Sequence, residues 1–133
     1  MTGIEWIIEA HGCDAAALAD GARLAALFQT LVAELELHPV GAPCWHRFPG
    51  TGGLTGFAML AESHLACHTF PEHHSLCLNL FCCRPRPDWD FEGNLKRIFH
   101  AASVRVRRIQ RPYDEPEDNQ LPELRSADPI PLV

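Results

Sequence analysis

The chain has 133 residues, 47% of them hydrophobic and 21% charged, with a formal net charge of −6. This length fits one domain with a single hydrophobic core. The negative charge argues against a nucleic-acid-binding protein, because such proteins gain much of their affinity by neutralising phosphates. No apolar run approaches the roughly 20 residues that span a membrane, and the N-terminus has acids where a signal peptide has a basic start. We therefore expect a cytoplasmic protein with no membrane contact.

The first part of the chain predicts a strand, a long helix and a short strand. Residues 4–10 alternate apolar and polar side chains, which is the period of a strand. Asp14 is the expected N-cap of a helix that His38-Pro39 ends, with an apolar stripe of Leu24, Phe28, Leu31 and Leu35. Residues 43–48 predict a strand. The glycine-rich segment after it lacks the Lys-Ser/Thr of a phosphate-binding loop, so it predicts a turn.

The second part predicts four strands and one helix. The strands are expected at 54–62, 64–70, 75–83 and 104–109. Asp88 is the expected N-cap of a helix over 88–102, whose buried stripe would be Phe91, Leu95, Ile98, Phe99 and Ala102. We expect one domain over residues 1–115, followed by an acidic, proline-rich, extended tail over 116–133.

The order of these elements predicts the fold class. Consecutive strands joined by short loops pair antiparallel, because parallel pairs need long crossovers. We therefore expect an α+β two-layer sandwich, an antiparallel sheet with two helices packed on one face. The other face of such a sheet needs cover, and a two-fold partner is the commonest way to supply it. The pattern thus favours a homodimer.

Residues 60–74 carry four histidines, a serine and a cysteine within an apolar run, where unpaired polar groups cost stability. On a strand, His64 and His68 share a face about 13 Å apart, too far to bind one zinc ion. None of the six cysteines forms a C-x-x-C pair, so we expect no metal. Ser63 lacks the G-x-S-x-G context of a hydrolase nucleophile. A core strand with hydrogen-bonded histidines remains an alternative.

One string in this stretch resembles a known family. ESHLACHTFPEH at 62–73, followed by LNLF at 78–81 and by Cys83, is similar to the prokaryotic S-adenosylmethionine decarboxylase proenzyme. The likeness continues in HRF at 46–48 and in YDE at 113–115, and it covers residues 4–115. It implies an enzyme that cleaves its own chain.

The resemblance implies cleavage between Glu62 and Ser63 into chains 1–62 and 63–133. The Ser63 hydroxyl attacks the adjacent Glu62 carbonyl, and this intramolecular attack needs no encounter between molecules. The amide becomes an ester, β-elimination releases the Glu62 carboxylate and leaves dehydroalanine, and hydrolysis with loss of ammonia leaves a pyruvoyl group at position 63. His68 is the residue that matches the family's proton acceptor for this step.

The pyruvoyl cofactor then forms a Schiff base with the substrate amine and accepts the electrons released as carbon dioxide leaves. The resemblance assigns the general acid to Cys83, whereas Cys82, on the opposite strand face, is expected in the core. The resemblance also implies that Phe48, Phe70 and Glu72 line the pocket for S-adenosylmethionine, and two aromatic faces suit a flat base near a cation. The product would be decarboxylated S-adenosylmethionine, the aminopropyl donor for spermidine.

Several positions depart from the family pattern. Asn79 stands where aspartate is common, Arg84 where glycine is common, and Thr55 where serine is common. Phe70 replaces a frequent tryptophan, and His73-His74 replaces an aromatic-glycine pair. These departures leave alternatives open: a pyruvoyl-dependent decarboxylase of ornithine or arginine, or a regulatory homologue that does not cleave itself.

Overall fold

The computed structural model describes residues 2–114, and the predicted tail over 116–133 lies outside them. The described part contains strands, three α-helices and one 3-10 helix. In chain order they are β1 (Thr2–His11), α1 (Ala15–Leu18), α2 (Gly21–Glu34), β2 (Cys44–Arg47), β3 (Leu54–Leu60), β4 (Ser63–Phe70), η1 (Pro71–His73), β5 (Ser75–Cys82), α3 (Phe91–Phe99) and β6 (Ser103–Pro112).

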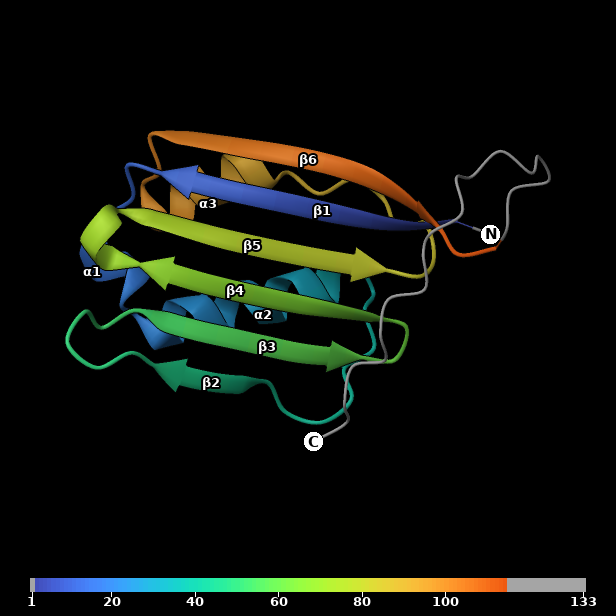
Figure 1. Cartoon of the computed structure of the whole chain (residues 1–133), viewed down its shortest axis with the longest axis horizontal. Coiled ribbons are helices and arrows are strands. Elements are labelled where there is room, and N and C mark those ends of the chain that lie inside the picture. Colours follow the sequence, from blue (N-terminus) through green and yellow to red (C-terminus); the bar gives the residue numbers. More distant parts are fainter. Residues whose placement is uncertain (1, 115–133) are drawn as a thin grey trace, which may run out of the picture.

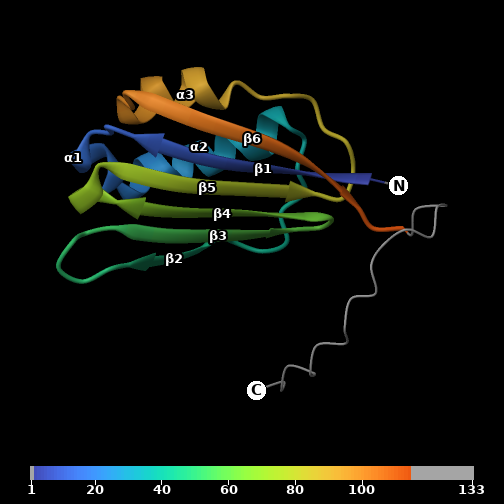
Figure 2. The ribbon, with the colours of Figure 1, turned by 45° about the horizontal axis from the view of Figure 1, so that its top comes forward.

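The strands form one sheet in the order β2-β3-β4-β5-β1-β6, and every neighbouring pair is antiparallel. The α-helices lie on one side of the sheet (Figures 1 and 2). We call that side of the sheet the covered face and the other side the open face. The predicted α+β two-layer sandwich is therefore confirmed, with α1 as a short additional helix.

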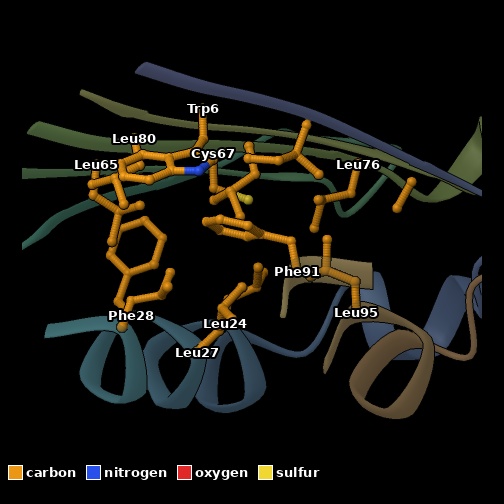
Figure 3. Close-up of a cluster of buried hydrophobic side chains, with 14 of the residues drawn as sticks. Trp6, Leu24, Leu27, Phe28, Leu65, Cys67, Leu76, Leu80, Phe91 and Leu95 are labelled. Carbon is orange, nitrogen blue, oxygen red and sulfur yellow. The ribbon is translucent and has the colours of Figure 1, made fainter. Parts of the chain in front are cut away.

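The core lies between the covered face and the helices. β1 alternates as its sequence predicts, with Trp6 and Ile8 buried and Glu5 and Glu9 on the open face. Figure 3 shows the side chains of α2 and α3 meeting those of the strands, and the rings of Trp6 and Phe91 lie 6.3 Å apart. Each such large apolar side chain contributes about 1.5–3 kcal/mol through its burial. This core holds the sheet rigid behind the site.

The predicted start of the long helix was wrong. Asp14 precedes the four-residue α1 and makes no capping hydrogen bond with its side chain. Asp20 begins the long helix instead, because its carboxylate accepts hydrogen bonds from the Ala22 and Arg23 amides. The predicted apolar stripe of the helix is buried from Leu24 to Leu35.

The predicted bounds of the second long helix were wrong in the same way. Its N-cap is Asp90, whose carboxylate accepts from the Gly93 amide, whereas Asp88 pairs with Arg108 on β6. The helix ends at Phe99 because His100 adopts a left-handed conformation with φ 57°. Ala102, predicted in the buried stripe, is exposed beyond this end.

Candidate active site

The β3–β4 hairpin carries the Glu62-Ser63 step. Leu60 and Ser63 pair across the two strands, so Ala61 and Glu62 form the turn between them. The prediction of a strand through residue 62 was thus two residues too long. The Ala61 amide donates to the His38 carbonyl at 2.8 Å, which ties the turn to the segment after α2. The Glu62-Ser63 peptide bond therefore lies at the exposed end of the sheet (Figure 1).

Glu62 is held at two points. Its carbonyl oxygen accepts a hydrogen bond from the Cys83 amide at 2.9 Å, and its carboxylate pairs with Arg84 Nε at 2.7 Å. Both side chains of the ion pair are largely exposed, so the pair adds little to stability. The Cys83 amide matters more for chemistry, because a donor on this carbonyl stabilises negative charge that develops on its oxygen during attack.

Ser63 faces Cys82 across β4 and β5. The two residues are register partners on the covered face, and their side chains are hydrogen-bonded. Burial raises the pKa of the Cys82 thiol, an effect that Arg86 and Ser63 oppose. Cys82 is buried, as predicted, but its contact with Ser63 was missed, because the pairing register of distant strands cannot be read from local sequence.

Cys83 is the accessible thiol of the pair. It is half-buried and borders a surface hollow of about 620 Å³, which is also lined by Thr2, Arg84, Pro85, Arg86 and Tyr113. The Tyr113 hydroxyl donates to the Cys83 carbonyl at 3.1 Å, so both sides of the Cys83 backbone are fixed. Cys83 is therefore a residue that a molecule in the hollow would contact.

A second group of predicted site residues lies at the other end of the sheet. His68 and Thr55 are register partners on β4 and β3, and His68 Nδ1 lies 3.0 Å from the Thr55 hydroxyl. Phe70 ends β4, Glu72 lies in η1, and Phe48 follows β2, with its ring 5.4 Å from that of His46. Figure 1 shows η1 and the β2–β3 loop together at the end opposite the β3–β4 hairpin.

The two groups are far apart within one chain. Five residues along β4 separate Ser63 from His68, a span of about 17 Å. The odd spacing also places the two side chains on opposite faces of the sheet. The structure therefore does not bring His68 to Ser63 within one chain.

His64 is part of an aromatic stack on the open face. Its ring lies between those of Phe57 and Phe81, at 6.2 Å and 5.6 Å between centroids, with interplanar angles of 22° and 17°. Its Nε2 atom lies 3.0 Å from Asn79 Oδ1, and Asn79 Nδ2 donates to Glu5 Oε1 at 3.1 Å. The sequence offered hydrogen-bonded histidines as an alternative but did not identify Asn79, Phe57 or Phe81 as the partners of His64.

Two further findings concern residues 2–114. In this part of the chain, no group of three or more His, Cys, Asp or Glu side chains could hold a metal ion. No helix there is both long and apolar enough to cross a membrane. The histidines of β4 instead have side-chain partners, Asn79 for His64 and Thr55 for His68.

Comparison with known proteins first defines the class of the chain. The crystal structure of the adenosylmethionine decarboxylase from Aquifex aeolicus matches with a TM-score of 0.69, over 89% of this chain and 97% of that one. The two sequences are 22% identical, so this likeness shows the fold. The chain is thus an α+β sandwich of the kind that this decarboxylase adopts.

The family follows from the sequence. The family model for S-adenosylmethionine decarboxylase matches residues 4–112. The S-adenosylmethionine decarboxylase proenzyme of Moorella thermoacetica is 33% identical over 113 residues, 83% of this chain and 87% of that protein. The proenzyme of Pyrobaculum arsenaticum is 39% identical over 80 residues, 59% of this chain and 62% of that protein. The chain belongs to the S-adenosylmethionine decarboxylase family, and the resemblance seen in the sequence is confirmed.

Proposed function

We propose that the chain is a self-processing, pyruvoyl-dependent enzyme that converts S-adenosylmethionine to decarboxylated S-adenosylmethionine and carbon dioxide. The family of the chain supports this function. The observation that carries it is the position of the Glu62-Ser63 bond at an exposed hairpin, with the Cys83 amide donating to the Glu62 carbonyl. The product would serve as the aminopropyl donor for spermidine. The cytoplasmic location stays a prediction.

Self-processing begins with residues that are already in place. A bond forms between Ser63 Oγ and the Glu62 carbonyl carbon, the bond from that carbon to the Ser63 nitrogen breaks, and the nitrogen gains the proton lost by the hydroxyl. Negative charge develops on the Glu62 oxygen, where the Cys83 amide stabilises it. Ser63 is half-buried at the first position of β4, so the reaction takes place at the end of the sheet.

The residues present fit a pyruvoyl group at position 63. Formation of this group requires a serine at a hairpin with a polarised carbonyl before it, and both are present at Glu62-Ser63. Its use requires an accessible thiol, which Cys83 supplies at the end of the neighbouring strand β5. When formed, the group supplies an electron sink for the pair released with carbon dioxide. The Cys83 thiol holds a proton beside the hollow and can return it to the substrate carbon.

A homodimer completes this site. The open face exposes Phe57, Met59 and Ile109, at 43%, 54% and 40% of their surface, and none of the described helices covers them. Sheets of this kind pack face to face. We place the two-fold axis between two such sheets and perpendicular to their strands. Rotation about this axis reverses the strand direction, so the Ser63 end of one protomer lies over the His68 end of its partner. Because the Ser63 side chain points to the covered face, the partner's His68 must reach the Ser63 hydroxyl around the start of β4, beside the β3–β4 turn.

The substrate assignment rests on the groups at the His68 end. Phe48 is 41% exposed and Glu72 is exposed, so an aromatic face and a carboxylate are available to an adenine and its neighbouring sulfonium. Ornithine or arginine would need a second free carboxylate, besides Glu72, for the distal charge. Glu5 and Glu9 on the open face are already paired, with Arg111 and Arg107. These pairs favour S-adenosylmethionine.

The function is tested by measuring release of carbon dioxide from S-adenosylmethionine, ornithine, arginine and lysine, each offered to the purified protein. We expect turnover of S-adenosylmethionine alone. Turnover of ornithine or arginine without turnover of S-adenosylmethionine would overturn the substrate and leave the cofactor assignment standing. No cleavage and no turnover of any substrate would indicate the regulatory homologue.

Replacing Cys83 by alanine should separate processing from turnover. The backbone amide that contacts Glu62 remains in Cys83→Ala, so the chain should still be cleaved. Loss of a positioned acid should slow turnover about 10²- to 10⁴-fold, because the substrate carbon must then take its proton from water. The readouts are intact mass and steady-state rate, with the exposed Cys44→Ala as the matched control. Unchanged turnover in Cys83→Ala would remove this thiol from the mechanism.

A further inference from the structure

A chain of polar contacts crosses the open face and ends beside position 63. Arg111 on β6 pairs with Glu5 on β1, Glu5 accepts from Asn79 on β5, and Asn79 contacts His64 on β4. His64 directly follows the residue on which the proposed function depends. The proposed cleavage and decarboxylation steps do not use this histidine.

The contacts fix which ring nitrogen of His64 carries a proton. A carboxylate only accepts hydrogen bonds, so the Asn79 amino group must face Glu5, at 3.1 Å. The Asn79 oxygen then faces His64 Nε2 at 3.0 Å. Because this oxygen also only accepts, Nε2 must carry the hydrogen. In the neutral imidazole, Nδ1 is left with a free lone pair.

The ring is also held still. Phe57 and Phe81 lie against its two sides with nearly parallel planes. Nδ1 is separated from the backbone of residue 64 only by the Cγ and Cβ atoms, and that backbone is bonded directly to residue 63. The Glu62 carboxylate is another acceptor nearby, but it pairs with Arg84. Within residues 2–114, the Nδ1 lone pair of His64 therefore has no hydrogen-bond partner and is available as a base.

We propose that His64 is a catalytic residue that takes a proton from the substrate amine at position 63, and that Asn79 and Glu5 position it. This inference rests on the proposed function. An α-amino group is largely protonated at neutral pH and attacks a ketone only after losing its proton. The proton passes from the ammonium to Nδ1, and the amine nitrogen keeps the electron pair. The ring becomes an imidazolium whose Nε2–H still donates to Asn79, so its orientation does not change.

The test compares two nucleophiles on purified, cleaved protein. S-adenosylmethionine carries an ammonium, whereas hydroxylamine is uncharged at neutral pH and needs no base. Covalent capture of S-adenosylmethionine under cyanoborohydride reduction, followed by the mass of chain 63–133, should be about 10²-fold or more slower in His64→Gln. Labelling by hydroxylamine should not change. His11→Gln, which alters an exposed histidine at the end of β1, should match the wild type with both reagents.

Capture of S-adenosylmethionine by His64→Gln at the wild-type rate would overturn the inference, and so would an equal loss with both reagents. Failure of hydroxylamine to label the wild type would instead contradict the pyruvoyl group itself. A second measurement does not depend on cleavage. The ¹⁵N spectrum of histidine-labelled Ser63→Ala should show His64 as the Nε2–H tautomer, and Asn79→Leu in that background should give a mixture. An Nδ1–H tautomer with Asn79 intact would contradict the proposal.

Discussion

Replacing Ser63 by alanine is expected to yield one 133-residue chain with no decarboxylase activity. The wild type should separate under denaturing conditions into residues 1–62 and a second chain that begins with a pyruvoyl group at position 63. Without the hydroxyl, no ester can form with the Glu62 carbonyl, and neither cleavage nor the electron sink is available. Intact mass and the rate of carbon dioxide release measure the two losses.

The fold should survive this change, because Ser63 contributes one hydrogen bond to Cys82 at the end of the sheet. Loss of such a bond costs about 0.5–1.5 kcal/mol, so thermal unfolding should stay cooperative. Ser103→Ala removes an exposed hydroxyl from the start of β6 and should be cleaved like the wild type. Wild-type protein that remains uncleaved yet releases carbon dioxide would refute the pyruvoyl mechanism.

The sequence predicted the architecture well because strand alternation and helical stripes are local signals. The errors lie at the ends of the helices, where tertiary contacts decide which of two similar residues is the N-cap. Asp14 and Asp20 are both good N-caps, and the structure uses Asp20 for the long helix. Of Asp88 and Asp90, the structure uses Asp90 as the N-cap, because Asp88 pairs with Arg108 on β6, 20 residues later in the chain.

Only those parts of the site that depend on local sequence could be predicted. The Glu62-Ser63 step and the greater exposure of Cys83 over Cys82 follow from local sequence. The Ser63–Cys82 contact and the path from Glu5 through Asn79 to His64 depend on which strands become neighbours. β1 lies between β5 and β6, so residues more than 70 positions apart meet on the open face. No local pattern carries that information.

The separation of Ser63 from His68 leads to the sharpest expectation about assembly. Alone, Ser63→Ala and His68→Ala chains should both stay uncleaved, the first for lack of a nucleophile and the second for lack of a proton acceptor. When the two are coexpressed with different tags, the His68→Ala chain should be cleaved. In a mixed dimer, its intact Ser63 shares an active site with the intact His68 of the Ser63→Ala partner. Random pairing at equal expression puts about half of the His68→Ala chains in such dimers.

Intact mass of each tagged chain measures the outcome, and light scattering confirms that the mixture is dimeric. The Ser63→Ala chain should remain whole in every pairing, which provides an internal control. Cleavage of the His68→Ala chain would show that the partner's His68 acts on its Ser63. Side-chain motion cannot close the gap of about 17 Å between Ser63 and His68 along β4 of one chain. A mixed dimer with no cleaved His68→Ala chain would show that two copies of this sheet do not share the site. Ser63 would then have to take its proton acceptor from its own end of the sheet.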